Sequence, residues 1–255
     1  MNTSETFIEL GFYGKLPGYG DFIQKRLPQS FINPWHQWLL SGMQAQREND
    51  AENWLSYYLN CPAWCFVLSA GICGKQAVTG VTIPSVDKVG RYFNFTMAAT
   101  LPEEIEPASF AIKHYQWIMD IKDLALSILD DEMDQQEIEQ SINSRSLDLS
   151  YSTGPRSTFA INKQQIHVVY PEETSINTQV PGLLDKLLSR ELGCYGLWWH
   201  KGSSQVSAQA VACADMPSPQ TYLGLIINRS DLSTSQRAAT EPETDYIDEL
   251  FSNRE

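Results

Sequence analysis

Three consecutive β-like runs on short connections constrain the fold of this chain more than any other feature. They cover Trp64 to Ala70, Ala77 to Ile83 and Tyr92 to Thr100. Ala70 to Gly74 predicts a hairpin turn after the first run, and the charged, Gly/Pro-punctuated segment Pro84 to Arg91 follows the second. These connections are too short for parallel crossovers, so we expect an antiparallel sheet.

Segments with helical periodicity lie on both sides of these runs in the sequence. Apolar residues recur at helical spacing from Phe31 to Met43, from Glu52 to Leu59, and over the long stretch from Pro107 to Met133. Ser30 is placed to cap the first of these helices. The expected fold class is therefore α+β, with a mostly antiparallel central sheet flanked by helices.

A Ser/Thr/Gly/Pro-rich connection at Ser150 to Pro155 is the expected internal boundary. It divides an N-terminal core at 1–149 from a C-terminal subdomain at 150–228, and we expect a disordered acidic tail at 229–255. In the tail, Tyr246 to Phe251 places its apolar residues on one face of a short helix, which is either frayed or folds on a partner. The subdomain is expected to form its own sheet from strands at 157–162, 165–170, 195–200 and 205–213, with helices at 181–192 and 219–227.

The charge balance restricts the classes of partner. A formal net charge of −13 argues against general binding to nucleic acid or to anionic membranes, because both need a positive field. Much of the excess is local, since eleven acidic residues lie between Glu103 and Glu139 against Lys113 and Lys122. This acidic segment is read as a solvated helix face, with a docking surface for a basic partner as the alternative.

The sequence also indicates a compartment and excludes several chemistries. Five irregularly spaced cysteines, a polar start at Met1 to Glu5 and the lack of any run near 20 apolar residues predict a cytoplasmic protein with reduced thiols and no membrane insertion. The four histidines fall on separate predicted elements, and the Cys61 and Cys65 pair has no second pair at zinc spacing. We therefore expect no metal and no cofactor.

The stretch from Gly11 to Trp38 combines clustered glycines with charge. Glycine permits positive φ angles and close backbone approach, so the segment containing Lys15 and Asp21 predicts a shaped, charged loop, which Lys25 and Arg26 follow. A phosphate-binding loop is excluded because the required first glycine is replaced by Glu9, and Leu16 stands where Ser or Thr would bind magnesium.

The segment from Pro84 to Arg91 is a second loop of the same kind. Like the first, it combines turn residues with Lys and Asp at the end of a strand, and it adds Arg91. We expect the two loops to meet and to form a charged recognition surface. The alternative is an internal role, in which Asp21 caps its own turn and Arg91 pairs with Asp87 or Asp21.

A hydrolase is the alternative from another functional class. Ser85 and Lys88 match the S-x-x-K pair of penicillin-recognising enzymes, but the accompanying S-D-N and K-T-G elements are missing. Asp21 and Asp87 could instead act as paired carboxylates if the fold brought them together. The G-x-S-x-G elbow of serine hydrolases is absent from the sequence.

Three sequence motifs, two of them long and specific, occur in the first hundred residues of the chain. They are G-x-x-G-K-L-P-x-x-G-D-F from Gly11 to Phe22, P-S-V-D-K-V-G-R-Y-F from Pro84 to Phe93, and L-P-x-x-F-x-x-x-W-x-x-W-L from Leu27 to Leu39. W-x-F-V-L-S-x-G-x-C-G at 64–74 and LWWHKGS at 197–203 add weaker support. On these residues the chain resembles the TagF family, accessory proteins of bacterial type VI secretion systems.

The chain departs from the family pattern at several positions. His36 stands where an Asp is expected between two tryptophans, Cys65 replaces a basic residue, and Asn94 with Phe95 replaces a Pro-Leu pair. We expect these departures to alter surface contacts and to leave the fold unchanged.

The resemblance implies regulation instead of catalysis. TagF-like proteins repress type VI secretion after translation and are associated with a cytoplasmic scaffold protein that contains a forkhead-associated (FHA) domain. Some relatives carry a fused PP2C-type phosphatase, and this chain is similar to the stand-alone form. The expected core is longin- or profilin-like with a C-terminal α/β extension. The remaining alternative for the function is that the protein is a structural part of the secretion apparatus.

The partner surface expected on these grounds consists of charged residues of the two loops. Reversing the charges of Lys15 and Arg91 is expected to abolish scaffold binding without changing thermal stability. The full set is Lys15, Asp21, Lys25, Arg26, Asp87, Lys88 and Arg91.

Overall fold

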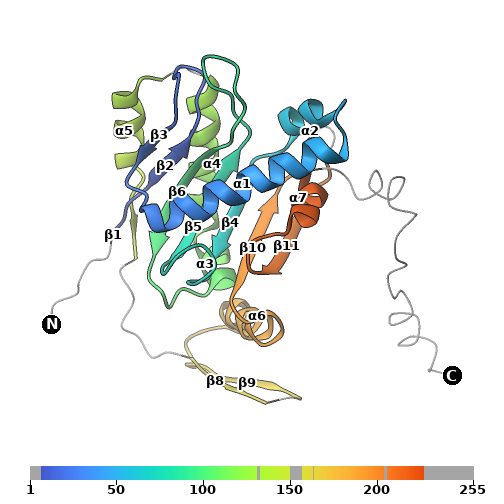
Figure 1. Ribbon diagram of the computed structural model, residues 1–255. Helices are drawn as coiled ribbons and strands as arrows, with labels where there is room; N and C mark the ends of the chain where they lie inside the picture. Colours follow the sequence, from blue (N-terminus) through green and yellow to red (C-terminus); the bar gives the residue numbers. More distant parts are fainter. Residues whose placement is uncertain (1–6, 131–132, 150–156, 163, 204–205, 227–255) are drawn as a thin grey trace.

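A seven-stranded antiparallel sheet forms the centre of the computed structural model, which describes residues 7–130, 133–149, 157–162, 164–203 and 206–226 (Figure 1). The spatial order of its strands is β11-β10-β4-β5-β6-β2-β3. Their bounds are β2 Gly11–Gly14, β3 Ile23–Lys25, β4 Trp64–Leu68, β5 Ala77–Ile83, β6 Phe95–Leu101, β10 Tyr195–His200 and β11 Gln209–Ala214.

Two short strand pairs lie outside this sheet. The strand β1 (Phe7–Ile8) pairs with β7 (Leu147–Asp148), and β8 (Thr158–Ile161) pairs with β9 (Ile166–Val169). The predicted α+β class with antiparallel pairing is confirmed, because every strand pair described is antiparallel.

Helices cover both faces of the central sheet, which explains why β4 and β5 are buried along their whole length. On one face lie α1 (Gln29–Asn49), α2 (Trp54–Asn60) and α7 (Pro219–Ile226) (Figure 1). The other face is covered by α3 (Pro107–Lys113), α4 (Tyr115–Asp130) and α5 (Gln135–Asn143). The remaining helix, α6 (Ile176–Leu192), lies beyond the end of the sheet with the β8–β9 hairpin (Figure 1).

Aromatic packing fixes α1 on its face of the sheet. The fully buried Trp35 donates an indole hydrogen bond to Thr96 Oγ1 at 3.0 Å and stacks on Trp198 with ring centroids 5.8 Å apart. Aromatic pairs of this geometry add about 0.5–1.5 kcal/mol to area burial. Trp198 and Trp199 contact opposite faces of the sheet, as the alternation of a strand requires.

Two expectations about the helices were wrong. The helix expected from Pro107 to Met133 is interrupted at His114, where φ is −110° and ψ is 23°. Backbone hydrogen bonds run into and out of His114, so the interruption is a local kink between α3 and α4. The first helix begins at Gln29 after an N-cap at Pro28, so Ser30 is not its cap.

The expectation of a separate C-terminal sheet was also wrong. The strand β10 pairs with β4 over four residues, from Gly196 opposite Leu68 to Trp199 opposite Cys65, and β11 extends the same sheet. Among the strands described after residue 156, only those of the β8–β9 hairpin lie outside the central sheet. The expected tail at 229–255, with its segment from Tyr246 to Phe251, lies outside the described residues.

Candidate functional site

The two charged loops found in the sequence meet in space, as predicted. One connects β2 to β3 and the other connects β5 to β6. Ser85 Oγ donates to the backbone carbonyl of Lys15 at 2.7 Å, and the backbone N–H of Lys88 donates to the carbonyl of Tyr19 at 2.9 Å. The Arg91 guanidinium donates to the carbonyl of Gly20. We call this pair of loops, residues 15–22 and 84–93, the double loop.

A buried carboxylate holds the double loop together. Asp87 Oδ2 lies 2.9 Å from Lys15 Nζ and 2.6 Å from Arg91 Nε, so two cations share one oxygen. The other oxygen, Oδ1, accepts the backbone N–H groups of Val89 at 3.0 Å and Arg91 at 2.8 Å. Asp87 is 3% exposed and Lys15 is 5% exposed, so neither charge could be solvated by water instead.

These contacts determine the ionisation of Asp87. Burial alone would raise the pKa of its carboxyl group, but hydrogen bonds from the Arg91 backbone, the Lys15 side chain, the Arg91 side chain and the Val89 backbone outweigh burial. The pKa of Asp87 is therefore lowered well below its ordinary value of 3.8. The carboxylate stays charged at every pH at which the protein would act.

The helix α2 anchors the second loop, residues 84–93, through Tyr58. The Tyr58 hydroxyl donates to the carbonyl of Ser85 and accepts its backbone N–H, both at 2.9 Å. Burial raises the pKa of Tyr58, so its hydroxyl keeps the proton that it donates. In the sequence, Tyr58 stood out only as one apolar position of a short helix, and no local pattern indicates this contact.

An aromatic cluster supports the first loop. Phe22 stacks on Tyr13 with centroids 5.6 Å apart, meets Phe93 edge-on at 4.9 Å, and lies 5.0 Å from Lys15 Nζ. The Tyr13 hydroxyl and His36 Nδ1 are 2.6 Å apart, which ties the cluster to α1. Desolvation by burial lowers the pKa of His36, which favours the neutral ring in this contact.

The seven residues predicted as a partner surface divide into groups with different positions. Lys15 and Asp87 are buried, with little of either residue accessible at the surface. Asp21, Lys88 and Arg91 are exposed on the double loop. Asp21 accepts the backbone N–H of its neighbour Phe22 at 2.8 Å, in line with the alternative of a local cap.

The remaining two residues face a different element. Lys25 forms an ion pair with Glu139 of α5 at 3.0 Å, and the Arg26 guanidinium donates to Asn143 of the same helix. They therefore belong to the edge of the sheet beside α5. The expectation that reversing the charge of Lys15 leaves stability intact conflicts with its burial, because the new carboxylate would face Asp87.

The contacts do not favour the two hydrolase arrangements. The hydroxyl proton of Ser85 is committed to the carbonyl of Lys15, and Ser85 is buried whereas Lys88 is exposed. Paired carboxylates would raise one pKa, but the pKa of Asp87 is lowered and its partners are cations. Within the described ranges, His, Cys, Asp and Glu residues form no group of three that could hold a metal ion.

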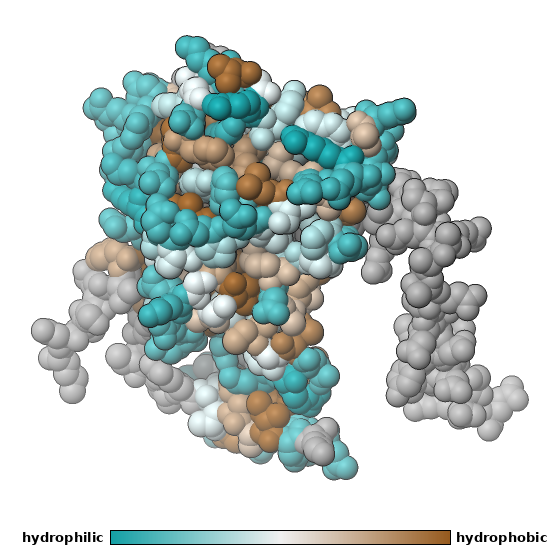
Figure 2. Space-filling model, in the orientation of Figure 1, coloured by the Kyte–Doolittle hydropathy of each residue, from teal (hydrophilic) through white to brown (hydrophobic). Residues whose placement is uncertain are grey.

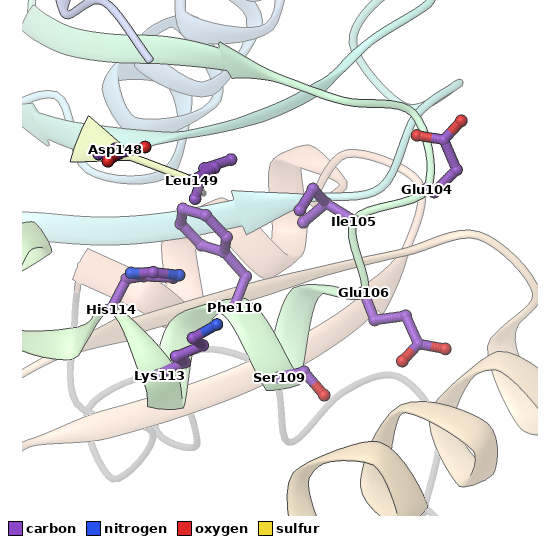
Figure 3. Close-up of a pocket in the computed structure, with 9 residues that line it drawn as sticks. All are labelled: Glu104, Ile105, Glu106, Ser109, Phe110, Lys113, His114, Asp148 and Leu149. Carbon is purple, nitrogen blue, oxygen red and sulfur yellow. The ribbon is translucent and has the colours of Figure 1, made fainter. Parts of the chain in front are cut away.

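A shallow pocket of about 360 Å³ lies away from the double loop, beside the start of α3 (Figure 3). The carboxylates of Glu104 and Glu106 point to different sides in this view, and Phe110 lies beneath Leu149. Burial, together with the charge of Lys113, lowers the pKa of His114. The pocket contains none of the predicted site residues, and its acidic groups do not converge on one point. Its lining is Glu104, Ile105, Glu106, Ser109, Phe110, Lys113, His114, Asp148 and Leu149.

Comparison with known families gives one family model that spans both loops. The model of the TagF N-terminal domain, described as type VI secretion system-associated, matches residues 11–145, more than half of the chain. The chain belongs to the TagF family. The predicted resemblance is therefore confirmed, and it covers the double loop and the helices α1 to α5.

A solved structure extends the similarity beyond the matched domain. The crystal structure of PA0076 from Pseudomonas aeruginosa PAO1 is similar over 91% of this chain and 97% of its own, with a TM-score of 0.70 and 29% sequence identity. The match therefore includes part of the C-terminal region as well as the TagF domain. No curated protein matches the chain.

The departures from the TagF pattern lie largely inside the protein, which corrects the expectation that they alter surface contacts. Cys65 is 1% exposed in β4, and Asn94 donates from Nδ2 to Thr82 Oγ1 at 3.2 Å in the buried floor of the double loop. Phe95 is fully buried, and His36 packs in the aromatic cluster. These substitutions therefore affect core packing.

None of the helices described has the length and apolar character needed to cross a bilayer.

Proposed function

We propose that this protein is a non-catalytic regulator that represses a type VI secretion system after translation by binding the FHA-domain scaffold of that system. Membership of a family associated with type VI secretion supports a role in that secretion system. The observation that carries the binding role is the double loop, in which buried charges hold an exposed tip in one conformation. We further propose that binding takes place in the cytoplasm, where the scaffold is expected.

The exposed tip has the composition of a recognition surface. Val89 is 68% exposed and Phe22 is 38% exposed, and they lie among the exposed charged residues Asp21, Lys88 and Arg91. Arginine and aromatic side chains are enriched where protein interfaces are strongest. An apolar residue surrounded by charges also permits selection between partners by charge complementarity.

The buried network supports this role through the entropy of binding. The backbone of Val89 and the side chain of Arg91 are fixed by Asp87, which is itself fixed by Lys15. A loop that is ordered before binding does not lose that conformational entropy on association. Under this proposal, Lys15 and Asp87 act as positioning residues, whereas Lys88, Val89 and Arg91 contact the scaffold.

The test is a binding measurement with a matched pair of double variants. Lys88→Glu with Val89→Ser changes the tip, and Lys113→Glu with Ile112→Ser makes the same charge reversal and replaces a comparable exposed apolar side chain on α3. We expect the tip variant to lose at least about tenfold in affinity for the purified scaffold, about 1.4 kcal/mol, while the α3 variant binds like wild type. Both variants should keep the wild-type melting temperature.

A cellular readout separates regulation from a structural role. If the protein is a repressor, the tip variant should release secretion in cells, and the α3 variant should keep it repressed. Equal scaffold binding by both variants would remove the tip from the interface. Stoichiometric co-purification with the assembled apparatus would favour a structural component over a regulator.

A further inference from the structure

A groove lies along α1 beside the double loop. It has a volume of about 400 Å³ and is lined by Leu40, Met43, Gln44 and Arg47 of the helix and by Tyr92 of the double loop. The four helix positions follow the pattern i, i+3, i+4, i+7, so they share one face of α1 over two turns. Figure 2 shows apolar side chains among hydrophilic ones on the face of the molecule that α1 crosses in Figure 1.

The groove combines apolar side chains with one basic group. Met43 is 4% exposed at the bottom of the groove, whereas Leu40 is 43% exposed at one end. At the other end Arg47 stacks on Trp54, with its guanidinium carbon 4.3 Å from the ring centroid. An arginine that stacks on an aromatic face keeps N–H groups free to bind a carboxylate. The groove therefore suits a segment that carries an acidic residue two helical turns away from an apolar one.

The charge of Arg47 is not matched nearby. In the part of the chain that the structure describes, no carboxylate forms an ion pair with it. The adjacent Glu48 accepts a hydrogen bond from Gln44 at 2.8 Å and does not line the groove. Because the other lining residues are uncharged, the groove is positive in a chain with a net charge of −13. An acidic occupant is therefore complementary to it, and a basic one would be repelled.

The chain has a segment with this chemistry in its C-terminal region, outside the described residues. Between residues 241 and 251 there are five acidic residues and no basic residue. Pro242 predicts the start of a helix, because proline is favoured at the first helical position. One face of that helix would carry, again at i, i+3, i+4 and i+7, the residues Glu243, Tyr246, Ile247 and Leu250.

The two faces match when the segment runs antiparallel to α1. Seven residues separate Glu243 from Leu250, and seven separate Leu40 from Arg47, which is about 10.5 Å in a helix. We propose that residues 242–251 form a helix that docks antiparallel in the groove along α1 of the same chain. Glu243 then lies at Arg47, Leu250 lies at Leu40, and the apolar side chains between them cover the bottom of the groove.

The described chain ends close enough for this contact to be made within one molecule. The helix α7 packs on α1, with the rings of Tyr222 and Trp38 centred 5.4 Å apart, and it ends at Ile226. Sixteen residues lie between Ile226 and Glu243. A linker of that length spans about 20–24 Å as a coil and up to about 50 Å when extended. Linkage of this kind gives an effective concentration of the order of mM, so a weak contact is enough for docking.

The first test measures hydrogen exchange in the full-length protein. Amides of residues 242–251 should exchange at least about fivefold more slowly than in a synthetic peptide of residues 239–255, at about 1 µM and about 50 µM protein alike. Leu40→Asp should abolish this protection, and Leu184→Asp, the same substitution on an exposed leucine of α6, should preserve it. Exchange like that of the peptide, protection that depends on concentration, or protection that responds equally to the two substitutions would overturn the proposal.

The second test reads the register by exchanging charges and does not rely on an apolar substitution. Glu243→Arg should reduce the protection by about threefold, as should Arg47→Glu, because each change brings like charges together. Combining the two should restore the protection. Combining Glu243→Arg with Arg190→Glu, on an exposed arginine of α6, should not restore it. Failure of the first combination, or equal restoration by the second, rules out the antiparallel register.

Discussion

Lys15 and Asp87 are 72 positions apart in the sequence, yet their side chains form a buried ion pair with Nζ and Oδ2 separated by 2.9 Å. The pair joins the loop after β2 to the loop after β5, and each charge compensates the desolvation of the other. A charged residue of the double loop thus lies below the surface. It helps to fix the conformation of the exposed tip.

Removing the cation from this pair should destabilise the protein. Lys15→Met keeps the aliphatic part of the side chain but leaves the buried Asp87 with Arg91 as its remaining side-chain cation. We expect a loss of about 2–4 kcal/mol in the free energy of unfolding, measured by urea denaturation.

Lys88→Met on the same loop is the matched control. Its side chain is exposed, so the change should stay within about 0.5 kcal/mol. Equal effects of the two substitutions would mean that the buried pair contributes nothing to stability.

The lowered pKa of Asp87 predicts a stability contribution with a definite pH range. Because the folded pKa lies below the unfolded value of about 3.9, the unfolded state binds the proton first as the pH falls. The contribution is fully present above about pH 4 and is lost as the pH falls from there through the folded pKa. Chemical denaturation between pH 7 and 2 should show a steeper acid loss for wild type than for Asp87→Asn. Identical slopes would contradict the ionised, hydrogen-bonded carboxylate.

The sequence predicted much of the fold because the relevant signals are local. The strand runs, α2, α7 and the β8–β9 hairpin follow from periodicity and turn residues close to them in the chain. The place of β10 could not be predicted in this way. Its pairing with β4 joins residues about 130 positions apart, and that choice depends on the whole sheet. A buried strand has the same apolar sequence pattern whichever strand it pairs with.

The sequence predicted the pair of loops that forms the candidate site, but it did not predict the role of each residue within them. Glycines and charges identify both loops, and the position of each loop at the end of a strand led to the expectation that they meet. Nothing local distinguishes the buried Lys15 from the exposed Lys88, since burial depends on a carboxylate supplied by the other loop. For the same reason Tyr58 was missed, because its contact with Ser85 is tertiary.

Gly14 is required by both conformation and space at the start of the first loop. Its φ is +142°, and a Cβ there would lie 2.2 Å from the backbone carbonyl oxygen of Asn94. Gly14→Ala should therefore cost at least about 3 kcal/mol, because backbone strain and a backbone clash act together. Gly90 also has a positive φ, of +85°, but open space around it. Gly90→Ala should cost about 1 kcal/mol, and thermal unfolding that ranks the two in the opposite order would contradict this account.

Asp185 should control the attachment of α6 to the sheet. It is fully buried and accepts hydrogen bonds from Ala108, Ser109 and the Tyr195 hydroxyl, so Asp185→Ala leaves several donors without a partner. We expect a loss of about 2–4 kcal/mol, with hydrogen exchange increasing first in α6 and the β8–β9 hairpin.

Asp120→Ala is the comparison, because its contact with Gln116 is exposed and its removal should change stability by less than about 0.5 kcal/mol. Exchange that rises equally in β4 and β5 would show that the substitution unfolds the whole domain cooperatively. A selective rise in α6 would instead show that this helix is held to the sheet mainly through the carboxylate of Asp185.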